Sequence, residues 1–229
     1  MSDVGPLPPD GVRTRGADPT GTRLLLIRHG EAVCNVSGVI GGPKGCAGLT
    51  ARGREQAGAL RDRLAASGEL AEAAVGYVSA LPRAQETAAF LAPAVPALAS
   101  PTIEAFLNEL EPGEADGLTW PDFVKSYGVP DWARDPDAPL SPGGESLVAF
   151  ATRCERAFQT LADRHPGELV VVVCHGGVVE QLLRVVLGVD SRERLRLRTE
   201  HCSMAEVEIR DDRWRLLRYN DRAPVTSVG

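Results

Sequence analysis

The chain has 229 residues with a formal net charge of −6, and 43% of its residues are hydrophobic. This length favours one large domain with a substantial core, and the composition is typical of a soluble globular protein. The acidic balance argues against nucleic acid as the main partner, because binding to a phosphate backbone needs a dense basic patch. No apolar run approaches the length of a membrane helix, so no membrane partner is expected.

The five cysteines form no Cys-x-x-Cys pair, and their odd number does not favour a disulfide scaffold. The N-terminus also lacks the basic start and apolar segment of a signal peptide, so we expect a cytoplasmic protein. Residues 1–22 are rich in Pro, Gly and Asp and predict a disordered leader. We expect one domain over 23–221 and a short tail over 222–229.

Short apolar runs alternate with amphipathic segments along this domain. The elements expected in its first half are a strand at 23–27, a helix capped by Thr50, a strand at 75–79, a helix from Pro82 to about Leu91, and a loop with a short strand over 92–101. The elements expected in its second half are a helix from Glu145 to about Arg164, a strand at 169–174, a helix carrying Val179 and Leu182, and a hairpin of 204–210 with 214–219. Strands that alternate with helices predict an α/β fold with a mainly parallel sheet.

The stretch from Asn108 to Gly144 is rich in Pro, Gly, Asp and Trp and has little periodicity. A long insertion of this kind predicts a functional lid over residues 108–144. Its larger aromatic residues would either pack on the body of a substrate or form a small core of the lid itself; they are Trp120, Phe123, Tyr127 and Trp132.

Two histidines follow the two most apolar strands directly. His29 comes after the strand at 23–27 and its neighbour Arg28, and His175 comes after the strand at 169–174. Because ligands bind at the carboxyl ends of strands in open α/β sheets, we expect both imidazoles to face one pocket. A glycine follows each histidine, which allows a tight turn and leaves room for a ligand beside the backbone.

Arginines gather at the same predicted edge of the sheet. Arg28 precedes His29, and Arg83 follows the strand at 75–79. Guanidinium groups donate hydrogen bonds in a planar fork that suits phosphate oxygens, so two arginines with two histidines predict a site for a phosphoryl group. The four histidines lack the H-x-x-x-H spacing of a zinc site, so no metal site is expected. The glycine-rich loop near Lys44 does not have the residue order of a P-loop.

Six segments in a fixed order resemble the histidine phosphatase superfamily (phosphoglycerate mutase-like, branch 1). The resemblance runs from about Leu24 to Asn220, and the segments are 28–31 with Asn35, 49–57, 79–87, 107–109 with Gly113 and Gly117, 142–146, and 174–177. It implies a three-layer α/β/α sandwich and a phosphatase that needs no cofactor and no metal. One departure is Cys34, which stands where the family often has an aromatic residue.

The resemblance also implies a role for each site residue. His29 would be the nucleophile that forms a phosphohistidine. Arg28, Arg83 and His175 would hold the phosphoryl oxygens, and Asn35 would add a neutral donor. His175 would thus be both a catalytic and a phosphate-binding residue. Glu109 would protonate the leaving oxygen and later accept a proton from the attacking water. His201, just before the final hairpin, is expected to be structural or at the rim.

Several alternatives stay open from the sequence. The main expectation is a metal-independent phosphomonoester hydrolase acting on a small phosphorylated metabolite, with either broad or pathway-specific substrates. A phosphoglycerate mutase is the nearest competitor, although the 108–144 segment offers only Lys125 and Arg134 for a second phosphate. A catalytically weak binding or regulatory protein on the same fold is the third reading. A homodimer would be unremarkable.

Overall fold

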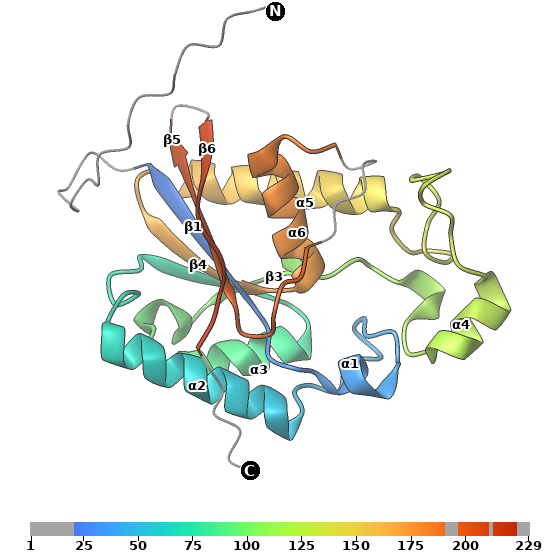
Figure 1. The fold of residues 1–229 in the computed structure, drawn as a ribbon, viewed down its shortest axis with the longest axis horizontal. Coiled ribbons are helices and arrows are strands. Elements are labelled where there is room, and N and C mark those ends of the chain that lie inside the picture. The colour runs from blue at the N-terminus through green and yellow to red at the C-terminus, as the bar shows by residue number, and fades with distance from the viewer. Residues whose placement is uncertain (1–20, 191–196, 211–212, 224–229) are drawn as a thin grey trace, which may run out of the picture.

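The computed structural model describes residues 21–190, 197–210 and 213–223. The predicted leader therefore lies outside the described residues except for its last two positions, and so does the predicted tail beyond residue 223. A six-stranded sheet runs through the centre in the order β3-β2-β4-β1-β5-β6. The helices lie on its two faces, so the predicted three-layer α/β/α architecture is confirmed (Figure 1).

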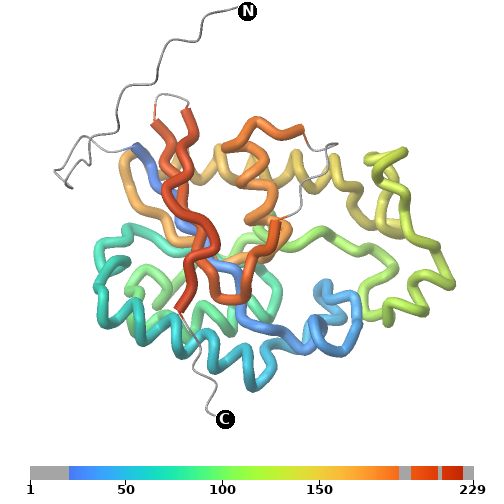
Figure 2. Tube along the Cα trace, in the orientation of Figure 1, coloured from blue at the N-terminus to red at the C-terminus, as the bar shows by residue number. Residues whose placement is uncertain are grey.

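Four neighbouring strands of the sheet are parallel. They are β1 (Thr22–Arg28), β2 (Val75–Ser79), β3 (Thr102–Glu104) and β4 (Leu169–Cys174). The last two strands, β5 (Met204–Arg210) and β6 (Arg213–Asp221), form an antiparallel hairpin that pairs with β1 through β5. The hairpin crosses the molecule beside β1 (Figure 2). The mostly parallel sheet and the closing hairpin were both predicted.

Alternate residues of the central strands enter two separate cores. Leu24 and Leu26 of β1 pack under α5 (Leu147–Arg164) and α6 (Gly176–Leu187). Leu25 and Ile27 pack on the opposite face against α2 (Ala51–Ser67) and α3 (Pro82–Leu91). A strand buried on both faces has to be apolar at every position, which explains the continuous apolar runs in β1 and β4.

Local signals set the helix boundaries. Thr50 caps α2, because its side chain accepts a hydrogen bond from the N–H of Gly53 at 2.9 Å. Pro82 occupies the first turn of α3, where its missing N–H costs nothing. The predicted start of a helix at Glu145 was two residues early, because Ser146 is the N-cap of α5 and accepts a hydrogen bond from the N–H of Ala149 at 3.1 Å.

The short strand expected within 92–101 was wrong in position. That stretch forms a 3-10 helix at Pro96–Leu98, and the strand is β3, directly after it. Three prolines fall within 92–101 and lack the N–H that a strand pairing requires.

The 108–144 segment contains one α-helix, α4 (Trp120–Tyr127), and lies beside the short helix α1 (Val33–Ser37) in Figure 1. The two regions are joined by a bridge of Val39 with Thr119. Phe123 is fully buried, with its ring centroid 5.2 Å from that of Trp120, so it forms a small core of this segment. Trp120 itself is 50% exposed.

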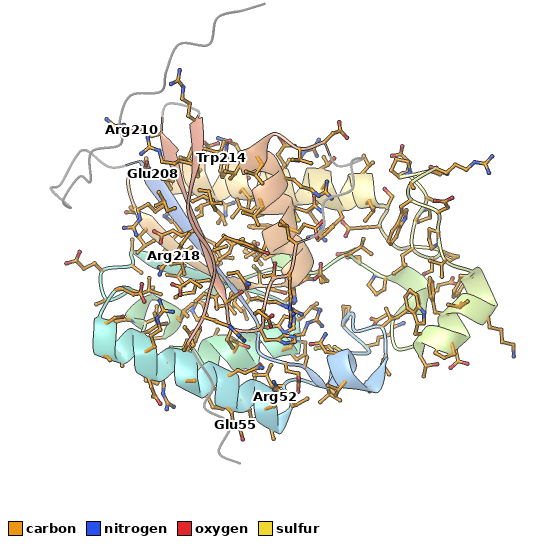
Figure 3. The ribbon with its side chains drawn as sticks, viewed as in Figure 1. Arg52, Glu55, Glu208, Arg210, Trp214 and Arg218 are labelled. Carbon is orange, nitrogen blue, oxygen red and sulfur yellow. The ribbon has the colours of Figure 1, made fainter. Side chains whose placement is uncertain are left out.

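The hairpin is tied to the rest of the fold by ion pairs. Arg218 of β6, labelled in Figure 3, lies 2.8 Å from the carboxylate of Glu206 on β5 and 2.6 Å from that of Glu69 beyond α2. Arg23 of β1 pairs with the same Glu206. The buried carboxylate of Glu206 is therefore compensated by two guanidinium groups. No helix in the described ranges has both the length and the apolar character needed to span a bilayer.

Candidate active site

The two predicted histidines lie together at the carboxyl ends of β1 and β4. Their ring centroids are 5.1 Å apart, and His29 and His175 are 3% and 0% exposed. The parallel register places Arg28 opposite Cys174, so the residues that follow them leave the sheet side by side. The N–H of His29 donates to the carbonyl of Cys174 at 3.0 Å, which fixes this arrangement.

His29 presents its Nε2 atom to the site. Its Nδ1 atom lies 2.6 Å from the carbonyl oxygen of Gly30, and a carbonyl only accepts, so Nδ1 carries the proton. The Nε2 lone pair accepts a hydrogen bond from Nε of Arg83 at 3.1 Å. Burial, and then the charge of Arg83, hold the pKa of His29 well below its usual value. The ring is therefore neutral and its Nε2 atom carries a lone pair in place of a proton, as a nucleophile requires.

Arg83 stands between the two histidines. It comes from the first turn of α3, and its Nε atom also lies 3.2 Å from Nδ1 of His175. Its Nη1 atom donates to the carbonyl of Gly41 at 2.7 Å. The side chain is thus held at three points, with its Nε atom within hydrogen-bond distance of both imidazoles.

Arg28 is the last residue of β1 and directly precedes His29. Its Nη1 atom donates to the carbonyl of Thr199, while its buried Nε atom has no hydrogen-bond partner among the described residues. An unpaired buried guanidinium N–H is costly, and an anionic ligand would satisfy it. Gly176 makes room here, because a Cβ atom at that position would lie 3.3 Å from Arg28 Nε.

Glu109 reaches the same pocket from the turn after β3. Its Oε2 atom accepts a hydrogen bond from the N–H of Gly177 at 3.0 Å, at the N-terminus of α6. A Cβ atom at Gly177 would lie 2.2 Å from Glu109 Oε1, so a larger residue there would displace the carboxylate from this position. The turn itself is clamped by Arg153 of α5, whose Nη1 atom donates to the carbonyl of Phe106 at 2.8 Å and to that of Asn108 at 3.0 Å.

Asn35 lies at the rim of the pocket and is exposed. Its Oδ1 atom accepts from the N–H of Ala32 at 3.0 Å and lies 3.2 Å from Nε2 of His201. With its oxygen occupied by two donors, the amide nitrogen of Asn35 is the group left for a ligand. The predicted residues Arg28, His29, Arg83, Glu109 and His175 thus lie together at one edge of the sheet, and His201 links Asn35 to this cluster.

The sequence interpretation missed how close His201 lies to His29. Its ring centroid is 5.8 Å from that of His29, and its segment is fixed because the N–H of Cys202 donates to the carbonyl of Arg28 at 3.0 Å. Burial, and then the charge of Arg28, lower the pKa of His201 to about 4. One signal was available: an antiparallel strand next to β1 must begin where β1 ends.

Two further polar residues, Ser79 and Asn108, were also missed. Nε2 of His175 lies 2.7 Å from Oγ of Ser79, which in turn donates to Oδ1 of Asn108 at 2.8 Å. Within the described ranges, no group of three or more His, Cys, Asp or Glu residues is placed to hold a metal ion. The pocket therefore combines a neutral imidazole lone pair, two guanidinium groups and a carboxylate, a set that can hold and transfer a phosphoryl group.

Comparison with known proteins agrees with this class of site. Residues 24–222 match the model of the histidine phosphatase superfamily (branch 1), and the chain belongs to this family. It is 30% identical to the metal-independent phosphoserine phosphatase of Arabidopsis thaliana over 91% of this chain and 85% of the relative. It is also 30% identical to the adenosylcobalamin/alpha-ribazole phosphatase of Escherichia coli K12, over 88% of this chain and 97% of the relative.

A solved structure shows the same fold. The mycobacterial glucosyl-3-phosphoglycerate phosphatase, determined in complex with VO3, superposes with a TM-score of 0.71 at 25% identity and covers 87% of this chain and 99% of its own. These relatives confirm the expectation that the chain is an enzyme of the phosphatase class.

Proposed function

We propose that the protein hydrolyses phosphate monoesters of small metabolites without a metal ion, through a phosphohistidine on His29. The observation that carries this proposal is the state of the His29 ring. Its Nδ1 proton is committed to the carbonyl of Gly30 at 2.6 Å, and its Nε2 lone pair points at Arg83 Nε, 3.1 Å away. A phosphoryl group held by that guanidinium would lie against the nucleophilic atom.

In the first step, Nε2 of His29 attacks phosphorus and the ester P–O bond breaks. The ring then carries a positive charge, which the carbonyl of Gly30 stabilises through the Nδ1 proton. Glu109 in its protonated form gives its proton to the leaving oxygen. In the second step, water attacks phosphorus, the N–P bond breaks, and Glu109 takes the proton from that water.

The charge on the transferred group is countered by Arg28, Arg83 and His175. Arg28 and Arg83, together with His175 once it is protonated, would perform the task that metal ions perform in other phosphoryl-transfer enzymes, which supports a metal-independent reaction. Among the three relatives named above, one is described as a metal-independent phosphoserine phosphatase.

Hydrolysis is favoured over the mutase alternative by the 108–144 segment. A mutase needs cations for a second phosphate, and the only basic residues in this segment, Lys125 and Arg134, are both exposed. The binding-protein alternative is disfavoured because each catalytic side chain that the family resemblance implies is present. A cytoplasmic location is part of the proposal, since all five cysteines hold free thiols, as a reducing compartment would maintain.

Phosphate release from a panel of phosphomonoesters in excess EDTA would test the proposal. We expect wild type to be active, and His29→Ala to lose activity completely. After rapid acid-free quenching, the intact protein should carry one added phosphoryl group on His29. Activity that survives in His29→Ala would refute the proposal, and isomerisation of 3-phosphoglycerate without net phosphate release would favour the mutase instead.

A further inference from the structure

His175 is the inner end of a buried chain of hydrogen bonds. Its Nε2 atom lies 2.7 Å from Ser79 Oγ, and Ser79 Oγ lies 2.8 Å from Asn108 Oδ1. His175 and Ser79 are fully buried, and Asn108 is 7% exposed. Since these side chains are buried, their polar atoms need partners within the chain, and the direction of the bonds can be worked out.

Two backbone N–H groups settle that direction. The N–H of Ala80 lies 3.0 Å from Asn108 Oδ1, and a backbone N–H only donates, so this atom is the amide oxygen and not the nitrogen. Ser79 must therefore donate its only hydroxyl proton to that oxygen. The N–H of Leu81 donates to Ser79 Oγ at 3.2 Å. With its proton committed, Ser79 Oγ accepts from His175, whose Nε2 atom must carry a hydrogen.

His175 in its neutral form therefore has an unprotonated Nδ1 atom. Nδ1 lies 3.2 Å from Arg83 Nε and accepts its hydrogen, which it shares with the lone pair of His29 Nε2. The lone pairs of His29 Nε2 and His175 Nδ1 thus both face the position assigned to the phosphoryl group, and both accept from Arg83 Nε. An oxygen of a phosphoryl group that approaches Nδ1 would meet a lone pair, and the contact becomes a hydrogen bond only when Nδ1 gains a proton.

The charges around His175 also favour its neutral form in the absence of a ligand. Burial, and then Arg83, hold the pKa of His175 well below its usual value, and Arg28 and Arg153 act in the same direction. His29 faces the ring, and Glu109 is the acidic side chain of the pocket, bound at Gly177 two residues away. A bound dianion adds two negative charges against this cluster of cations and so favours the imidazolium.

We propose that Ser79 and Asn108 are positioning residues that hold neutral His175 as its Nε2–H tautomer, so that binding of a tetrahedral dianion is accompanied by uptake of one proton at Nδ1. The proton comes from solvent, and the only bond formed in this step is Nδ1–H. The inference rests on the proposed function only in assigning the phosphoryl group to this pocket. It assigns to the Ser79–Asn108 pair a role in the protonation of the site.

The tautomer is measurable by NMR on protein with ¹⁵N-labelled histidine. We expect the Nε2–H form for His175 and the Nδ1–H form for His29. His165, outside the pocket, is an internal control: its Nδ1 atom lies 2.9 Å from the Glu168 carboxylate and its Nε2 atom 2.9 Å from the Tyr77 hydroxyl, so it should be an Nδ1–H ring in every variant. His175 found as the Nδ1–H form in wild type would overturn the proposal.

Asn108 offers a matched pair of variants. Asn108→Asp keeps an oxygen that accepts from Ser79, so His175 should remain the Nε2–H form. Asn108→Ala removes this acceptor and frees the Ser79 hydroxyl to donate to Nε2 of His175, so the Nδ1–H form should become populated. An unchanged His175 tautomer in a folded Asn108→Ala protein, as judged by the unchanged His165 signals, would overturn the role of Asn108.

Proton uptake is measurable by calorimetry with tungstate, a dianion that keeps its charge near neutral pH. Titration at about pH 8, in two buffers of different ionisation enthalpy, should give uptake of about one proton per bound tungstate in wild type. Uptake should fall clearly below one in Asn108→Ala, whose Nδ1–H population donates without further protonation, and should stay near one in Asn108→Asp. Uptake near zero in wild type would overturn the proposal.

These readouts are separate from the test of the proposed function. A protein with the expected tautomer and proton uptake but no phosphohistidine on His29 would refute the catalytic proposal and leave this one standing. The reverse result, phosphohistidine on His29 with His175 as the Nδ1–H form, would refute this inference alone.

Discussion

The carboxylate of Glu109 accepts a hydrogen bond from the backbone N–H of Gly177, at 3.0 Å from Oε2. Gly177 lies two residues after His175, in the first turn of α6. The residue proposed as proton donor is thus fixed to the same strand end as a residue proposed to hold phosphate. Because Arg153 clamps the backbone of the turn that carries Glu109, neither end of this side chain is free to drift from the pocket.

Glu109→Gln should therefore remove proton transfer while keeping the hydrogen bond to Gly177. For a phosphate ester with a poor leaving group, such as an alkyl phosphate, we expect kcat to fall by about 10²–10⁴-fold. For p-nitrophenyl phosphate, whose leaving group departs without protonation, phosphohistidine should form and accumulate, because water attack still lacks its base. Steady-state kinetics and a phosphoenzyme assay on the same samples would measure both effects.

Glu111→Gln is the matched control for this prediction. Glu111 is two residues away and exposed, and its N–H donates to Glu145 at 2.9 Å. Since the substitution leaves that backbone contact in place, activity should stay within about twofold of wild type. Equal losses in both variants would remove Glu109 from its proposed role.

His201→Ala should weaken ligand binding by releasing Asn35. Nε2 of His201 lies 3.2 Å from Asn35 Oδ1, an atom already identified as oxygen because the N–H of Ala32 donates to it. Loss of one hydrogen bond of this kind costs about 1 kcal/mol, so KM and the inhibition constant for tungstate should rise by about fivefold with little change in kcat. His201→Asn, which keeps an N–H donor, should recover part of this loss. A fall in kcat at constant KM would contradict the positioning role.

Much of the site could be predicted because two patterns in the sequence are strong. β1 and β4 are apolar at nearly every position, which identifies them as central strands, and the histidines follow them directly. Since the carboxyl ends of parallel strands meet at one edge, His29 and His175 had to lie close together. The cap at Thr50 and the proline of α3 are equally local signals.

The remaining site residues are held by contacts between segments far apart in the chain, and such contacts leave no local pattern in the sequence. Ser79 and Asn108 are bonded through Oγ and Oδ1 across a gap of 29 residues, and nothing in either segment indicates the partner. Arg153 lies in α5, where the spacing of apolar residues predicts only which face of the helix is buried. Nothing in that spacing indicates that the guanidinium of Arg153 holds the turn that carries Glu109. Such side chains are fixed by buried backbone groups that need partners, a requirement visible only once the chain has folded.

Cys46 is expected to be the most reactive of the five cysteines. The thiols of Cys34 and Cys46 are neighbours that influence each other's titration, and Arg83 also acts on Cys46. These contacts, with that of Cys34 the largest, lower the pKa of Cys46, while burial raises the pKa of Cys154, Cys174 and Cys202. Cys46 is 8% exposed and Cys34 is 7% exposed, against 0–3% for the other three.

Iodoacetamide at about pH 6.5 should therefore label Cys46 first, because an ordinary thiol is almost entirely protonated there. Peptide mass spectrometry would identify the site. Cys46→Ser should abolish this early labelling, and Cys154→Ser should not affect it. Saturating tungstate should slow the reaction, since Arg83 would then be engaged by the anion. First labelling at any of the three deeply buried cysteines would contradict the prediction.

The buried histidines should also make the protein less stable in mild acid. In the folded chain the pKa values of His29 and His175 lie well below the ordinary value, whereas both titrate near about 6.5 in the unfolded chain. Below that pH the unfolded chain binds more protons, so the free energy of unfolding falls as pH falls. Over the whole interval from about pH 7.5 to pH 5.5, each of these two histidines lowers the free energy of unfolding by about 1.4 kcal/mol, so together they account for a loss of about 2–3 kcal/mol.

Urea unfolding at the two pH values would measure this loss, and His175→Gln separates the contribution of one ring. Gln keeps an N–H that can donate to Ser79 Oγ but does not titrate, so the variant should lose about 1.4 kcal/mol less than wild type over the same interval. Tungstate should reduce the loss in wild type, because the bound dianion favours the protonated form of His175 and binds only the folded chain. Equal stability of wild type at both pH values would show that these rings are protonated in the folded protein, and the neutral nucleophile would have to be abandoned.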